Sequence, residues 1–151
     1  MMMKKFLLLA LIVSMDASAS KVDDIIQSFE MSNVYAADWY KKGDNHIAES
    51  HNQYRDMKVN LSDTSGAITV ILPDTQKFDM LSIMPCYRLT KFIEYNKAPT
   101  WNDPETEDEK IIKNVFSEDI KDGASNEALL NGWKLRMMRL SNKYSCEVSK
   151  Q

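Results

Sequence analysis

The chain is poor in glycine, and this shortage excludes several common cofactor sites. It has four glycines in 151 residues, and none forms the clusters that cradle phosphate in P-loop or dinucleotide-binding proteins. Ser65-Gly66 also lacks the earlier glycine of a Gly-x-Ser-x-Gly nucleophile elbow. We therefore expect no nucleotide cofactor and no serine hydrolase of that type.

Histidine is equally scarce, and the chain has no convincing metal-binding pattern. His46 and His51 are the only histidines, and Glu49 lies between them. Paired ligands on a zinc-binding helix stand four residues apart, where their side chains converge, whereas these histidines stand five apart. The acidic run 103–109 lacks the alternating ligands and central glycine of a calcium loop. We expect no metal site and no cofactor.

Dense positive charge and long apolar runs are also missing from most of the chain. The net charge is −3, without a basic cluster, so a nucleic-acid partner is not expected, because phosphate neutralisation supplies much of such affinity. After residue 19 no apolar run approaches the roughly 20 residues that a bilayer span requires. We expect no stable membrane insertion of residues 20–151.

The N-terminus has the three parts of a secretory signal peptide. Lys4 and Lys5 precede the eight apolar residues Phe6–Val13, and Ala17-Ser18-Ala19 provides the small residues that signal peptidase accepts. The apolar run is too short for a membrane anchor. The pattern predicts cleavage between Ala19 and Ser20, which leaves residues 20–151 as a single soluble domain in the periplasm or outside the cell.

Cys86 and Cys146 are the only cysteines. An even count in an oxidising compartment favours a disulfide over free thiols. The bridge would close a loop of about 60 residues and stabilise the fold by about 4 kcal/mol in the chain-entropy model. A catalytic thiol is the less favoured alternative, because it needs a neighbouring base.

Hydrophobic periodicity predicts a mainly helical domain. Apolar residues at helical spacing predict helices over 21–42 and, on a thinner stripe, 45–57. Alternation around the turn-rich segment 62–66 predicts a β-hairpin that ends at Pro73. In 75–95 one helical phase continues across Pro85, which predicts two helices with a break near Met84, although added strands are an open alternative.

The C-terminal third is expected to contain a loop and two helices. Residues 96–104 form a loop with two prolines, and Thr106 with Glu109 makes a capping box that opens a helix. A last helix is expected from Ser125 to about Cys146, with Arg136, Arg139 and Lys143 along one edge of its apolar stripe. The resulting fold class is α+β, mainly α-helical, a single small domain with a minor β-hairpin that one disulfide pins.

These patterns favour a protein that binds another protein over an enzyme. The candidate interface residues are Trp101 in its proline-flanked loop and the edge Arg136, Arg139 and Lys143. A Trp101 that covers the core, and an edge that is only the solvated border of a helix, are the more common arrangements. The leading hypothesis is a non-enzymatic accessory subunit of an envelope machine, such as pilus or secretion-system assembly, with another envelope or secreted protein as partner. An immunity or inhibitor protein that blocks a wall-degrading enzyme is the alternative. A small secreted hydrolase and a periplasmic chaperone are less favoured.

Overall fold

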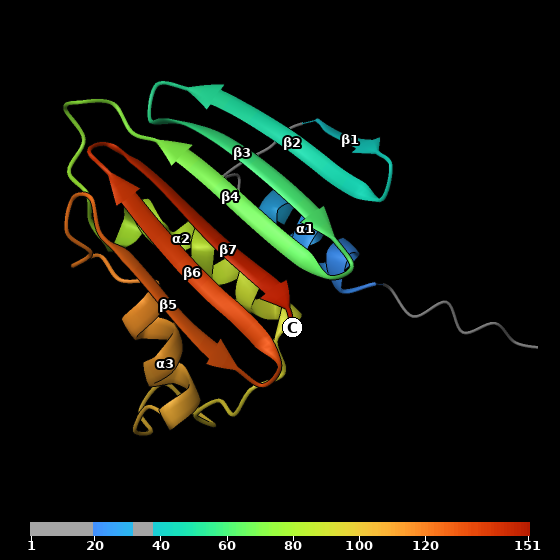
Figure 1. The fold of residues 1–151 in the computed structure, drawn as a ribbon, viewed down its shortest axis with the longest axis vertical. Helices are drawn as coiled ribbons and strands as arrows, with labels where there is room; N and C mark the ends of the chain where they lie inside the picture. Colours follow the sequence, from blue (N-terminus) through green and yellow to red (C-terminus); the bar gives the residue numbers. More distant parts are fainter. Residues whose placement is uncertain (1–19, 32–37) are drawn as a thin grey trace, which may run out of the picture.

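Seven strands form one antiparallel sheet in the computed structural model, which describes residues 20–31 and 38–151 (Figure 1). The strand order across the sheet is β1-β2-β3-β4-β7-β6-β5. The fold is therefore dominated by its sheet, and the predicted mainly helical architecture with a minor hairpin is wrong. In chain order the elements are α1 (Lys21–Met31), β1 (Trp39–Lys42), β2 (Asn45–Asn52), β3 (Arg55–Ser62), β4 (Ser65–Ile71), α2 (Met80–Arg88), the 3-10 helix η1 (Leu89–Phe92), α3 (Glu107–Val115), β5 (Ser125–Leu130), β6 (Trp133–Leu140) and β7 (Lys143–Lys150).

The molecule has two layers, and the core lies between them. Helices α1, α2 and η1 cover one face of the sheet, and α3 packs beside β5 at one end (Figure 1). Within the described ranges, no helix covers the opposite face. Alternate strand residues point into the core, so each inner strand has a buried and an exposed side. The inner-face core residues of the central strands are Met57, Val59, Leu61, Ile68, Val70, Tyr144, Cys146 and Val148.

The predicted β-hairpin is confirmed as β3 and β4. Gly66 on β4 faces the helical layer, and a side chain there would meet η1. A Cβ atom built on Gly66 would lie 2.7 Å from Cε2 of Phe92 and 2.8 Å from Cδ2 of Leu89. Glycine is required at this position because η1 approaches the strand so closely.

The helix expected over 45–57 is wrong, because this segment forms β2 and the start of β3. Its apolar stripe was thin, and the residues alternate between the faces of the sheet instead. Asn52 sets the turn between the strands, since its Oδ1 accepts the backbone N–H groups of Tyr54 (2.8 Å) and Arg55 (3.1 Å). An asparagine that bonds its own backbone in this way is a turn signal.

The helix expected over 21–42 is only partly correct. Helix α1 spans Lys21–Met31, whereas Trp39–Lys42 is the edge strand β1. Residues 32–37, which the prediction also made helical, lie outside the described residues. Gly43 has a φ of 61° in the turn that leads from β1 into β2. This turn makes Gly43 part of a hairpin and not the end of a long helix.

Residues 80–92 are helical, as the first of the two interpretations expected, but the predicted break at Met84 is wrong. Helix α2 continues through Pro85 to Arg88 and then tightens into η1. The backbone bond that Pro85 cannot make would reach the carbonyl of Leu81, a residue on the exposed side of the helix. Pro85 itself is buried, so α2 continues with one backbone hydrogen bond missing inside it.

The helix expected after Thr106 is confirmed. Helix α3 begins after Thr106, whose Oγ1 accepts the N–H of Glu109 (3.1 Å), while the N–H of Thr106 donates to Oε2 of Glu109 (2.9 Å). This is the reciprocal arrangement of a capping box. Three acidic residues in the first turn also complement the helix dipole.

The final helix expected over 125–146 is wrong, because the segment forms β5, β6 and the start of β7. Two tight turns divide it: Asn131 (φ 48°) and Gly132 (φ 84°) connect β5 to β6, and Ser141 (φ 55°) lies between β6 and β7. Asn-Gly is the dipeptide that two-residue hairpin turns favour. The apolar residues at helical spacing belong to different strands and do not form one stripe.

The predicted disulfide between Cys86 and Cys146 is confirmed. It joins α2 to strand β7, with a Cα–Cα distance of 5.7 Å and a sequence separation of 60. Both residues are buried in the core. The bridge therefore ties the helical layer to the middle of the sheet.

The N-terminal predictions fall largely outside the structure. Residues 1–19, including Ala19 of the predicted cleavage site, lie outside the described residues, and Ser20 is the first residue described. In the part of the chain that is described, no helix has the length and apolarity needed to cross a membrane. The signal peptide and its cleavage stay predictions.

Candidate functional site

A surface pocket of about 430 Å³ lies beside the loop that carries Trp101. Helix α2 contributes Tyr87 to its wall, the segment after η1 contributes Tyr95, and α3 contributes Ile112. Aromatic and aliphatic side chains therefore form part of the wall, and the carboxylates of Asp103, Glu105 and Glu109 also line the pocket. Trp101 itself is one of the lining residues.

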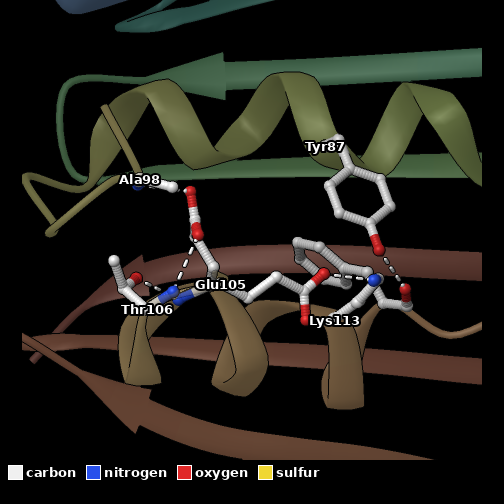
Figure 2. A network of polar contacts seen from close by, with 7 residues as sticks. Tyr87, Ala98, Glu105, Thr106 and Lys113 are labelled. Carbon is white, nitrogen blue, oxygen red and sulfur yellow. Dashed lines mark hydrogen bonds and ion pairs between the residues drawn. The ribbon is translucent and has the colours of Figure 1, made fainter. Parts of the chain in front are cut away.

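The first turn of α3 fastens this loop to the rest of the fold. Besides capping the helix through Thr106, the carboxylate of Glu109 accepts the backbone N–H of Ala98 at Oε1 (2.9 Å). Dashed lines at Ala98 and Thr106 mark these two hydrogen bonds in Figure 2. The accepted N–H groups of Thr106 and Ala98 hold the pKa of Glu109 below its usual range. The clamp thus uses an ionised carboxylate.

Further hydrogen bonds brace the loop from within. Asp103 accepts both the backbone N–H (2.9 Å) and the hydroxyl (2.8 Å) of Thr100. At the base of the loop, Thr106 donates its hydroxyl to the carbonyl of Asn96 (2.6 Å), and Asp108 accepts the N–H of Asn96 (2.9 Å). The loop is therefore an ordered element, although it has no regular secondary structure.

The turn between β5 and β6 supports the same loop from the sheet. Asn131 donates from Nδ2 to the carbonyl of Glu94 (2.8 Å). The Asn131 side chain also reaches the carboxylate of Asp108 (3.4 Å). The left-handed Asn131 therefore has two roles, because it makes the hairpin turn and links that turn to the entry of the loop.

Trp101 stands at the outer end of this braced loop and exposes 92% of its surface. A tryptophan ring held in water is a large apolar surface without cover, and tryptophan is enriched among residues that dominate protein interfaces. The fold pre-positions the backbone at Trp101, because Thr100 and Asp103 on either side of it are hydrogen-bonded to each other. The loop can present the ring without first being ordered.

Tyr87, Glu105 and Lys113, which also line the pocket, take part in a second set of polar contacts (Figure 2). Lys113 on α3 forms an ion pair with Glu105. The hydroxyl of Tyr87 donates to the carbonyl of Phe116 (2.7 Å), and its ring packs edge-on against that of Phe116. Burial, with smaller contributions from Glu105 and Glu118, raises the pKa of Tyr87, so the hydroxyl stays a proton donor.

The segment that builds the site is acidic. Residues 94–113 contain six carboxylates and three lysines, a net charge of −3, equal to that of the whole chain. The excess of carboxylates around the pocket and loop therefore repels anionic groups and attracts cationic ones. The arrangement is suited to contact with a positively charged surface.

The other predicted interface residues do not join this site or one another. Arg136 lies on the outer sheet face opposite Glu127 and Glu147, and Lys143 is exposed at the start of β7. Arg139 instead donates to the carbonyls of Ile120 (3.0 Å) and Ser141 (3.2 Å). The expected edge is wrong because Arg136 and Arg139 point to opposite faces of β6.

Arg139 is a packing residue. Its guanidinium lies 4.1 Å from the ring centroid of Phe78, which itself packs edge-on against the buried Tyr144. A cation over an aromatic face is attracted by the ring electrons. Arg139 thus helps to close the end of the core and is not available as part of a basic surface row.

The histidines lie on a strand and do not converge. His46 shares the inner side of the sheet with its pairing partner Leu61, whereas His51 is on the other side, where it contacts Asp56 (3.0 Å). Glu49 forms an ion pair with Lys58 (3.4 Å). Within residues 20–31 and 38–151, no group of three metal-ligating side chains is found.

Sequence reasoning identified Trp101 and the capping box but missed the pocket between them. Tyr87 and Tyr95 were assigned to helical segments, and no local pattern indicates that they face the loop. The contact from Glu109 to Ala98 spans eleven residues, so it depends on how the loop folds back over α3. The proline-flanked loop directly before the Thr106 capping box was the one sequence signal at this place.

The pocket and loop are suited to binding another molecule, and the carboxylate of Glu109 holds the loop in place. Glu109 has a lowered pKa, whereas a general acid needs a raised one. Comparisons of the chain with protein-family models, curated proteins and solved structures find no match. The function is therefore inferred from the loop, the pocket and their charges.

Proposed function

We propose that the chain is an exported, non-enzymatic protein-binding factor of the periplasm or cell exterior, which docks on its partner through the Trp101 loop. The observation that carries this proposal is the 92% exposed Trp101 ring on a loop braced by Asp103 and Glu109. Pre-ordering a contact loop reduces the entropy lost on binding. Large apolar rings in such a position are common anchors of protein interfaces.

Two features support the proposed location. The N-terminal sequence has the pattern of a cleavable signal peptide. The disulfide between Cys86 and Cys146 is a bond that persists in oxidising compartments and is rare in the cytosol. Both favour a protein that works among envelope or secreted proteins.

Two versions of the function rest on different surfaces. A protruding, braced loop favours an inhibitor or immunity protein that inserts Trp101 into a cleft of its target. An accessory subunit of an envelope machine would instead use an apolar helix face, and α2 exposes 74% of Leu81 and 44% of Met84. The loop is the better supported surface, because its geometry is fixed by several hydrogen bonds.

The test compares matched variants in an affinity capture from the envelope fraction of the source. Trp101→Ala and Leu81→Ala each remove one exposed apolar side chain, so both should leave the fold intact. We expect Trp101→Ala to abolish the stoichiometric capture of a partner and Leu81→Ala to leave it unchanged. Loss with Leu81→Ala alone would support the accessory-subunit version, and retention by both variants would contradict the proposal.

A further inference from the structure

We propose that the pocket beside Trp101 receives an arginine side chain of the partner protein, with its guanidinium against the tyrosine rings and facing the carboxylates of the pocket. This inference rests on the proposed function and deepens it by naming the chemistry that the partner must present. The Trp101 ring would contact the partner surface next to that arginine.

The first argument is the unbalanced charge of the pocket. Three of its lining residues are carboxylates, and only Glu105 has a cationic partner, Lys113. Asp103 and Glu109 bond to N–H and hydroxyl groups of the loop, and neither forms an ion pair with any described residue. Asp103 and Glu109 therefore add two negative charges to the pocket that no direct ion pair neutralises. Lys113 acts on Glu109 without contact and is the smallest of the influences that lower the pKa of this carboxyl.

The second argument is the affinity of the pocket wall for cations. The ammonium of Lys97 lies 4.9 Å from the ring centroid of Tyr95, so this ring already holds one cation. Lys97 lines a neighbouring pocket, and Tyr95 lines both. Inside the pocket beside Trp101 the single basic side chain is Lys113, which Glu105 holds. A cation from another molecule can thus use the pocket side of Tyr95.

The third argument selects arginine among possible occupants. A guanidinium is planar, stacks on aromatic rings and donates several hydrogen bonds to carboxylates, whereas a lysine ammonium is more strongly hydrated. An acidic segment would be repelled by Asp103 and Glu109. A purely apolar segment would cover their charges without pairing them, which is unfavourable. The same repulsion disfavours docking in a glycosidase cleft, where two carboxylates flank the substrate.

The direct test is an NMR titration of the full exported protein with three short peptides. Acetyl-Gly-Arg-Gly-amide is compared with the same peptide carrying lysine and with one carrying citrulline, which has the shape of arginine without its charge. We expect the arginine peptide to shift the amide of Ala98 and the indole N–H of Trp101. Citrulline should bind about tenfold more weakly, because it loses the cation–π and ionic contacts.

Three variants assign the effect to the pocket. Asp103→Asn keeps the shape and an oxygen acceptor for Thr100 but removes the charge, and Tyr95→Leu keeps an apolar wall but removes the ring. Each should weaken binding of the arginine peptide by about threefold. Glu127→Gln removes one charge from the outer sheet face and should leave binding unchanged. The spectra of the free variants report whether each one keeps its fold.

The outcomes separate this inference from the proposed function. Equal binding of the arginine and citrulline peptides, or shifts confined to residues outside the pocket, would overturn the inference. If Trp101→Ala still abolished capture of the partner, the proposed function would stand without the arginine site. Stronger binding of the lysine peptide would replace arginine by lysine as the occupant. If the arginine peptide binds in the pocket but Trp101→Ala does not reduce capture of the partner, the arginine site would stand. The proposal that the Trp101 loop docks on the partner would then be overturned.

Discussion

Glu109 accepts the backbone N–H of Ala98 across eleven residues, at 2.9 Å. The same carboxylate caps the helix on which it stands, through the N–H of Thr106 (2.9 Å). One side chain therefore fixes the start of α3 and the path of the loop that precedes it. Because Trp101 lies between Ala98 and Thr106, this contact fixes the ends of the backbone segment that carries the exposed ring.

Removal of this carboxylate should loosen the loop while the domain stays folded. In Glu109→Ala, the amides of Ala98 and Thr106 lose their acceptor, and we expect their hydrogen exchange to become several-fold faster. Glu107→Ala is the matched control, since Glu107 is in the same turn and forms an ion pair with Lys110 at the surface. Unchanged exchange at Ala98 in Glu109→Ala would show that the clamp does not hold the loop.

The clamp should also respond to pH in a defined direction. The backbone N–H groups of Thr106 and Ala98 lower the pKa of Glu109 in the folded protein. A lowered pKa means that the contribution is present above the ordinary glutamate pKa and is lost as the pH falls through the lowered value. The amide shifts of Ala98 and Thr106 should therefore titrate with a midpoint below that of an ordinary glutamate. A midpoint at or above the ordinary value would contradict the clamp.

Gly66 should not tolerate a side chain. In Gly66→Ala the new methyl group would press on Phe92 and Leu89, and we expect a loss of about 1–3 kcal/mol in unfolding free energy. Ala67→Ser on the exposed side of the same strand is the control and should change stability by less than about 0.5 kcal/mol. Denaturant unfolding measures both. A neutral Gly66→Ala would mean that η1 can move away from β4.

Loss of the disulfide should destabilise the domain strongly. Cys86 and Cys146 close a loop of 60 residues, for which the chain-entropy model gives about 4 kcal/mol. Unfolding of the double variant Cys86→Ala/Cys146→Ala tests this value against the oxidised wild type. Alkylation of the wild type without reductant should find no free thiol. A free thiol in the natively exported protein would contradict the bridge.

The correct and incorrect parts of the sequence prediction have a common physical origin. Elements defined by local contacts were predictable, such as the capping box of Thr106 and Glu109 and the hairpin around 62–66. The last three strands were mistaken for a helix because Leu130, Met137 and Tyr144 also stand at helical spacing. Asn131-Gly132 was the decisive local signal, since both residues have positive φ and this dipeptide favours a tight hairpin turn.

The functional site was less accessible to sequence reasoning than the fold. The proline-flanked loop made Trp101 a candidate interface residue, but a tryptophan that covers the core was the favoured interpretation, and its 92% exposure overturns that interpretation. The pocket in turn needs Tyr87 from α2 and Ile112 from α3 to meet. Such a meeting depends on long-range packing, which no periodicity reports. The prediction that Arg136 and Arg139 form one edge was wrong because it assumed a helix. The two residues lie on a strand, where side chains alternate between the two faces.

The central claim, that the Trp101 loop is the docking surface, is tested most directly by photo-crosslinking in the source cell. A benzophenone amino acid placed at position 101 is compared with one at position 140, where Leu140 is also exposed (69%) but lies on the sheet. We predict one dominant crosslinked partner from position 101 and none from position 140. The same partner crosslinked from position 140 but not from position 101 would contradict the account.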